Sequence, residues 1–196
     1  MGNKDYAFVY TREELIKLGF KYVGQDVKIF KNSVLVNPHN IYLDDGCQID
    51  DFVHIIASSS VKIGKRVHIA TMSTIAGGGE FIIGDYSGLA AGCRIITGSD
   101  DFLGNAMIGP CIPIEYRKVN RSFVKIEKHV VLGTNSIVLP GIIIPEGTAS
   151  TVMTVFYKSP NDSWSIYKGN PAEKIGRRKQ KIILEYEKQL IEEYGF

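Results

Sequence analysis

The sequence lacks long hydrophobic runs, runs of like charge and paired cysteines. None of its 196 residues belongs to an apolar run long enough for a signal peptide or a membrane span, so we predict a cytoplasmic protein without a membrane partner. The net charge is only +2 and no five like charges occur in a row, which argues against a nucleic-acid partner. The three cysteines have no CxxC spacing, and we interpret Cys47 and Cys93 as buried thiols in a reducing compartment.

What the sequence does contain is a repeat of aliphatic residues with a period of six, which is clearest between residues 63 and 95. The series shifts by two residues across three consecutive glycines and then resumes. Its members in this stretch are Ile63, Ile69, Ile75, Ile83, Leu89 and Ile95. Neither an α-helix nor a simple alternating strand gives this period. It indicates one short strand and one corner per six residues, which is typical of a parallel β-helix whose coils stack about 4.8 Å apart.

The repeat extends over most of the chain and is interrupted once. It begins at Val23, breaks off after Ile95, returns at Ile126 and degrades after Ile144. The interruption is rich in glycine, proline and asparagine, and a loop of this length in a compact domain usually has a function. We therefore predict a β-helix over residues 23–170, with a long loop at 97–123.

Helices are predicted at both ends, and the N-terminal one is short. Thr11 and Glu14 form a capping box before a short helix that Gly19 ends, within an N-terminal capping segment at residues 1–22. An apolar stripe predicts a C-terminal helix over residues 171–196. We expect both helices to cover the open ends of the β-helix, because unpaired strand edges invite aggregation. The predicted fold class is therefore all-β.

Several segments resemble a known family. The units IGKRVH, LAAGCR and IPEGTA and the run SIYKGNPAEKI resemble the hexapeptide-repeat acyltransferases, from Val23 to Ile175. YTREELIKLGFKYVG and TGSDDF resemble, more narrowly, bacterial sugar acetyltransferases of surface-polysaccharide pathways, including those that act on nucleotide-linked amino sugars. This resemblance implies a left-handed parallel β-helix, acetyl-CoA as co-substrate, and a homotrimer with active sites between its chains.

The spacing of the histidines argues against a catalytic metal. The γ-class carbonic anhydrases share this fold and bind zinc through three histidines, two of which form a close pair. In this chain no two histidines are closer than His54 and His68, which are fourteen residues apart. We therefore expect no metal cofactor.

His68 is the leading candidate for a catalytic base. It ends the unit IGKRVH, at a corner where we expect the side chain to point outward, and amine acylation requires a proton acceptor. The alternative is an ordinary solvated histidine. His54, which follows Asp50 and Asp51, is predicted to contact the substrate from another face of the β-helix.

The segment TGSDDF supplies the second set of candidates. Related galactoside and maltose acetyltransferases carry their catalytic histidine in the corresponding loop, where this chain has Asp100 and Asp101. Either these aspartates take part in catalysis, by orienting His68 or by acting in its place, or they form an Asx-turn. Predicted contacts with the acceptor are Ser99, Tyr116 and Arg117.

A groove for coenzyme A is predicted along small residues of the repeat, with a backbone N–H near Gly92 as the donor to the oxyanion. Turn geometry would explain the same glycines. Thr, Lys, Arg and Pro residues nearer the C-terminus complete the set that the resemblance implies. The predicted coenzyme A contacts are Ala91, Gly92, Gly133, Thr134, Thr151, Thr154, Lys158, Lys168, Pro171 and Arg177.

These observations predict an enzyme that transfers an acetyl group from acetyl-CoA to the amino group of a nucleotide-linked amino deoxy sugar, for O-antigen or capsule synthesis. One alternative is an O-acetyltransferase that acts on a sugar hydroxyl. Another is a non-catalytic β-helix scaffold or sugar-binding module.

Overall fold

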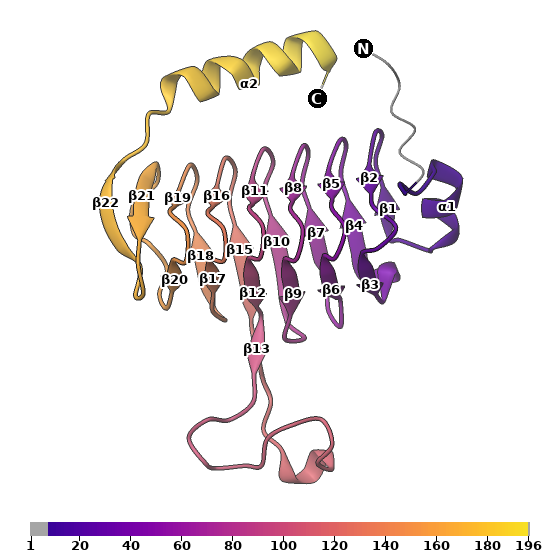
Figure 1. The fold of residues 1–196 in the computed structure, drawn as a ribbon, viewed down its shortest axis with the longest axis vertical. Coiled ribbons are helices and arrows are strands. Elements are labelled where there is room, and N and C mark those ends of the chain that lie inside the picture. Colours follow the sequence, from indigo (N-terminus) through magenta and orange to yellow (C-terminus); the bar gives the residue numbers. More distant parts are fainter. Residues whose placement is uncertain (1–7, 196) are drawn as a thin grey trace.

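The structure is a computed structural model that describes residues 8–195, so residues 1–7 of the predicted N-terminal segment lie outside the described residues. Short parallel strands stack into a β-helix with three sheets (Figure 1). The first sheet contains β1 (Tyr22–Val23), β4 (Ile41–Leu43), β7 (Val61–Ile63), β10 (Glu80–Ile83), β15 (Phe123–Ile126) and β18 (Ile142–Ile144). The second contains β2 (Lys28–Ile29), β5 (Gln48–Ile49), β8 (His68–Ile69), β11 (Gly88–Leu89), β16 (Val131–Leu132), β19 (Ala149–Ser150), β21 (Ser165–Lys168) and β22 (Glu173–Arg177). The third contains β3 (Val34–Val36), β6 (His54–Ile56), β9 (Thr74–Ala76), β12 (Arg94–Ile96), β17 (Ile137–Val138) and β20 (Val155–Phe156).

The core consists of the aliphatic residues that recur at every sixth position. Ile69 is fully buried and lies in register between Ile49 of one neighbouring coil and Leu89 of the next. Side chains of a strand alternate between the two faces of its sheet, so the residues that flank each aliphatic position point outward. The predicted left-handed parallel β-helix is confirmed. Cys47 and Cys93 are buried, free thiols, as predicted.

The two-residue shifts of the period fall at one corner of the β-helix, between the third and first sheets, and the first of them lies at residues 37–40, between β3 and β4. Residues 57–60 separate β6 from β7, and residues 77–79 separate β9 from β10. One coil later, residues 97–122 separate β12 from β15. The long loop is therefore an enlargement of a corner that is already wide in the preceding coils.

The N-terminal helix α1 (Arg12–Lys17) follows the predicted capping box. The Thr11 hydroxyl accepts a hydrogen bond from the Glu14 N–H, and the Glu14 carboxylate accepts one from the Thr11 N–H. Gly19, with φ +75°, follows the last turn in the left-handed region. Leu15 is buried against the core, so α1 covers the N-terminal end of the β-helix as expected.

The C-terminal prediction is wrong in its boundary. A helix was expected from Pro171, but Glu173–Arg177 form β22, which pairs antiparallel with β21. The unpaired edge of β21 offers a full set of backbone partners, and these outweigh a weak helical pattern. Helix α2 (Lys181–Tyr194) begins ten residues later and runs alongside the coils (Figure 1), so β22 rather than α2 covers the last coil. No helix among residues 8–195 has the length and apolarity needed to cross a membrane.

Two contacts hold α2 beside the coils. The Glu187 carboxylate lies 2.9 Å from Nε2 of the buried His129 and 3.5 Å from Nζ of Lys128. Burial would lower the pKa of Lys128, but the carboxylates of Asp85 and Glu187 together raise it. His129, which was not among the predicted site residues, therefore holds the helix against the coils.

Candidate active site

His68 lies on the outer face of the second sheet, where three side chains form a chain of hydrogen bonds. Its Nε2 is 2.9 Å from Oδ2 of Asp50, and Oδ1 of Asp50 accepts a hydrogen bond of 2.8 Å from the Gln48 amide. The His68 side chain is 51% exposed, so a ligand can reach it. On its other flank, the neighbouring residue in register is Gly88, which has no side chain to cover the ring.

The long loop projects from the β-helix on a two-stranded stalk (Figure 1). The stalk consists of β13 (Gly98–Ser99) and β14 (Asn120–Arg121), which pair antiparallel, and we call residues 100–119 the arm. The stalk rests on the glycine corner of the preceding coil. A Cβ at Gly79 would lie 1.9 Å from the Ser122 carbonyl oxygen, so only glycine fits there.

The two aspartates of the arm differ in their partners. Asp100 lies 3.4 Å from the Arg117 guanidinium and accepts a hydrogen bond from the Gly109 N–H. Asp101 is almost fully buried, and its oxygens accept hydrogen bonds from the N–H groups of Leu103 and Asn105. The Leu103 N–H is the main cause of the lowered pKa of Asp101, which the Asn105 N–H lowers further against the effect of burial. These contacts favour the Asx-turn interpretation for Asp101 and make it a weaker proton acceptor than an ordinary aspartate.

Within one chain, the arm and His68 lie on different sides of the β-helix. His68 is on the second sheet, whereas the arm leaves from the end of the third sheet at the opposite corner (Figure 1). The carboxylate beside His68 belongs to Asp50, so the idea that Asp100 or Asp101 of the same chain orients this histidine is wrong. His54 lies on the third sheet, in register with Val34 and Thr74, and shares no face with His68.

The other arm and stalk candidates are arranged as follows. Ser99 pairs with Asn120 in the stalk and is half-buried. Tyr116 is exposed, and its carbonyl accepts a hydrogen bond from the Met107 N–H, which closes the arm. Arg117 is mostly buried, and its Nε has no hydrogen-bond partner within residues 8–195. A polar ligand that enters the arm would therefore find a free donor at Arg117.

The predicted small residues do come together, on successive coils at the corner between the second and third sheets. The Asn135 N–H donates to the Ala91 carbonyl, and the Met153 N–H donates to the Thr134 carbonyl. A Cβ at Gly133 would lie 2.5 Å from Thr151 backbone atoms, so this glycine is required for coil stacking. The residues gathered there are Ala91, Gly92, Gly133, Thr134 and Thr151.

One residue of the predicted groove needs correction, and the predicted donor near Gly92 can be narrowed to a particular N–H. The N–H of Gly92 already donates to the Thr71 carbonyl, so it is not free to bind an oxyanion. The N–H groups of Ala91 and Thr134 have no acceptor in the described part of the chain, and that of Ala91, next to Gly92, is the donor that fits the prediction. Thr154 is fully buried, and its hydroxyl donates to the Thr151 carbonyl, so its side chain faces the core rather than a groove.

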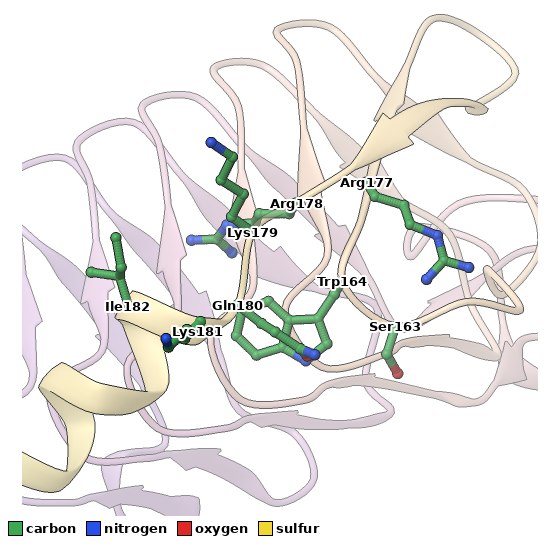
Figure 2. Close-up of a pocket in the computed structure, with 8 residues that line it drawn as sticks. All are labelled: Ser163, Trp164, Arg177, Arg178, Lys179, Gln180, Lys181 and Ile182. Carbon is green, nitrogen blue, oxygen red and sulfur yellow. The ribbon is translucent and has the colours of Figure 1, made fainter.

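The predicted basic residues form two groups rather than one. Lys158 and Pro171 line a hollow of about 620 Å³ between the last coil and the β21–β22 hairpin. Lys168 does not line this hollow and is the last residue of β21. Arg177 lines a second hollow, of about 660 Å³, near the start of α2. Arg177 and Arg178 point to opposite sides of the chain (Figure 2). Arg178 donates to the carbonyls of His129 and Gly147, so it has a structural role.

Sequence reasoning did not find Asp50 and Gln48 as partners of His68. Gln48 is twenty residues before His68, which is one full coil with its two-residue shift, and the two are in register. A count of whole coils, rather than of single units of six, would have placed Gln48 and Asp50 beside His68.

Comparisons with known proteins identify relatives of this chain by sequence and by fold. No protein-family model matches the chain. The dTDP-4-amino-4,6-dideoxy-D-glucose acyltransferase of Escherichia coli is 34% identical over 171 residues, which cover 87% of this chain and 88% of that protein. The structure of AntD, an N-acyltransferase from Bacillus cereus in complex with dTDP and 3-hydroxybutyryl-CoA, is 36% identical with a TM-score of 0.88 and covers 96% of this chain and 98% of AntD.

A variant of AntD in complex with dTDP-4-amino-4,6-dideoxyglucose and Coenzyme A is 37% identical, with a TM-score of 0.87, and covers 94% of this chain and 97% of that one. A maltose O-acetyltransferase from Clostridium difficile is 19% identical with a TM-score of 0.58, over 91% of this chain and 79% of its own, and shares the fold alone. The similarity to the Escherichia coli acyltransferase and to AntD exceeds 30% identity and covers most of this chain and of each of those proteins. The chain therefore belongs to the family of hexapeptide-repeat acyltransferases that its sequence predicts, together with the Escherichia coli acyltransferase and AntD.

Proposed function

We propose that this protein transfers an acetyl group from acetyl-CoA to the amino group of a nucleotide-linked amino deoxy sugar. The observation that carries this proposal is the end-to-end similarity to N-acyltransferases named for, or bound to, dTDP-4-amino-4,6-dideoxyglucose. That sugar is accordingly the acceptor to test first. The same similarity favours an amine acceptor over the sugar hydroxyl of an O-acetyltransferase, and catalysis over a purely structural scaffold.

The proposed reaction is a direct attack of the sugar amine on the thioester carbonyl. A C–N bond forms, the C–S bond breaks, and coenzyme A leaves as its thiol after receiving a proton. His68 takes the proton from the attacking amine, because it is exposed and already oriented by a carboxylate. The Ala91 N–H, which is free of backbone partners, stabilises the oxyanion.

We place the pantetheine chain of coenzyme A along the corner of small residues. Its phosphates lie beside the basic side chains near the last coil. Lys158 and Pro171 line the hollow between this coil and the β21–β22 hairpin, Lys168 ends the strand β21, and Arg177 lies at the end of β22. Flexible cationic side chains of this kind suit phosphate groups. Gly133, Thr134 and Thr151 would line the path between these phosphates and Ala91.

The protein acts as a homotrimer in this proposal, with active sites between its chains. Since the arm and His68 of one chain lie on different sides of the β-helix, a neighbouring chain is the means of bringing an arm to His68. Asp100, Tyr116 and Arg117 of that arm would then contact the acceptor, with Ser99 of its stalk and His54 on the third sheet. Analytical ultracentrifugation should give the mass of three chains.

We place the product in the synthesis of a surface glycan such as O-antigen or capsule, because a nucleotide-linked sugar is an activated donor for glycosyl transfer. We assign the reaction to the cytoplasm, in keeping with three free cysteines, one of them exposed. Loss of the acylated sugar from the surface glycan of a deletion strain would support this assignment, and an unchanged glycan would contradict it.

The test of function is a thiol-release assay with acetyl-CoA and 3-hydroxybutyryl-CoA against dTDP-, UDP- and GDP-linked amino sugars. We expect acetyl transfer to dTDP-4-amino-4,6-dideoxyglucose, with a product heavier by one acetyl group. In His68→Asn, kcat should fall about 10²- to 10⁴-fold. His39→Asn, an exposed histidine of a 3-10 turn, is the matched control and should behave as wild type. Full activity of His68→Asn would overturn the base role, and no transfer to any amino sugar would overturn the function.

A further inference from the structure

The hydrogen bonds of Asp50 determine which nitrogen of His68 carries the hydrogen. Asp50 Oδ2 faces Nε2 of His68 at 2.9 Å, and its other oxygen is occupied by the Gln48 amide at 2.8 Å. An ionised carboxylate is an acceptor only, so the ring nitrogen that faces it must be the donor in a neutral imidazole. Nδ1 then keeps a free lone pair, and it has no hydrogen-bond partner within residues 8–195.

We infer that Asp50 is a positioning residue for the transfer reaction, which holds His68 with hydrogen on Nε2 so that Nδ1 is the atom that accepts the proton from the sugar amine. This inference rests on the proposed function. The proton passes from the amine to Nδ1 as the C–N bond forms, and from the imidazolium to the thiolate of coenzyme A after the C–S bond breaks. Asp50 stabilises the imidazolium between these two steps.

The repeat keeps the three side chains in place. Gln48 and His68 lie in register on the adjacent strands β5 and β8, and the next residue in register, Gly88, leaves the ring open on that flank. Inward neighbours of both strands, Ile49 and Ile69, are fully buried. The outer side chains therefore stand on a rigid part of the β-helix, where register rather than a loop fixes their spacing.

Gln48 has a separate role, because it decides how a substituted Asp50 would turn. In Asp50→Asn, we expect the Gln48 amide to keep its orientation and to donate to the Asn oxygen, so that the Asn amide nitrogen faces His68. That nitrogen is a donor, and Nε2 must become an acceptor, which moves the hydrogen to Nδ1. In the double variant Gln48→Ala, Asp50→Asn, the carboxamide is free to rotate and to present its oxygen to Nε2 again.

The experiment compares wild type with Asp50→Asn, Gln48→Ala and the double variant, each checked for folding by its melting temperature. Nitrogen-15 NMR of the imidazole reports the position of the hydrogen without any substrate. We expect hydrogen on Nε2 in wild type and Gln48→Ala, on Nδ1 in Asp50→Asn, and a return toward Nε2 in the double variant. The kcat should fall at least about 10²-fold in Asp50→Asn, toward the value of His68→Asn, with KM for acetyl-CoA unchanged, and should partly recover in the double variant.

The outcomes separate this inference from the proposed function. Hydrogen on Nδ1 in wild type, or an Asp50→Asn variant with the spectrum and kcat of wild type, would overturn the positioning role of Asp50, and a double variant no better than Asp50→Asn would overturn the role of Gln48. If wild type transferred no acetyl group, or if His68→Asn were fully active, the proposed function or its base would fail instead. The NMR result would still decide, on its own, whether Asp50 controls the form of His68.

Discussion

The outer face around His68 and the arm around Asp101 place carboxylates in two different ways. Asp50 is held opposite His68 by the stacking of coils, and its oxygens bind two side chains. Asp101 is held by the backbone of its own loop and binds two N–H groups. A carboxylate that binds side chains can act on their protonation, whereas one that binds its own backbone shapes the loop. The outer face around His68 is therefore the rigid region, and the arm is the region that extends away from the β-helix.

The largest expected difference between coil and arm is in stability. Ile69 is fully buried between coils, so Ile69→Ala should lower the free energy of unfolding by about 2–5 kcal/mol. Phe102 in the arm is 82% exposed, and Phe102→Ala should change it by less than about 0.5 kcal/mol. Urea unfolding followed by circular dichroism measures both. A similar loss in the two variants would show that the arm packs as part of the core.

Changes in the arm should affect activity strongly, although they affect stability little. Replacement of the arm by a two-residue Asn-Gly turn between Ser99 and Asn120 keeps the paired stalk, for which such a turn is suited. Since the arm is proposed to hold the acceptor, kcat/KM should fall at least about 10²-fold, because orientation of the substrate is lost. The melting temperature should remain near that of wild type. A fully active armless protein would remove the arm from the site.

The smallest effect is a pH dependence that belongs to Asp101. Its pKa is lowered in the folded protein by the Leu103 and Asn105 N–H groups. A lowered pKa means that this carboxylate stabilises the fold above the ordinary aspartate pKa, and that the contribution disappears as the pH falls through the lowered value. Near neutral pH the Leu103 and Asn105 amide hydrogens should therefore exchange more slowly in wild type than in Asp101→Asn, as measured by NMR, and this difference should disappear in acid. A constant difference at all pH values would contradict this assignment.

The parts of the structure that sequence predicted are those with local causes. The helix after Thr11 was predictable because its capping box lies within four residues. The burial of Ile69 followed from a period that the chain displays many times over. Residues 173–177 were assigned to a helix because the edge of β21, which pairs with them, is invisible in a local pattern.

The candidate site was predictable in part. His68 was identified as an outward side chain, and the small residues near Gly92 were correctly grouped along one corner. The occupied N–H of Gly92 and the burial of Thr154 were not foreseen, because both depend on which atom of the preceding coil lies opposite.

By itself, the sequence determined the β-helix, the position of its interruption and the first helix, because repetition and short-range hydrogen bonds fix these features. Only the tertiary structure decided that Asp50 lies beside His68, that α2 is tied to His129, and that the arm leaves on another side of the β-helix. The physical reason is that each of these contacts joins residues of different coils or elements, or depends on the direction in which a corner opens. The number of residues in each coil decides which side chains of neighbouring coils lie opposite each other. A period of six alone does not reveal that number.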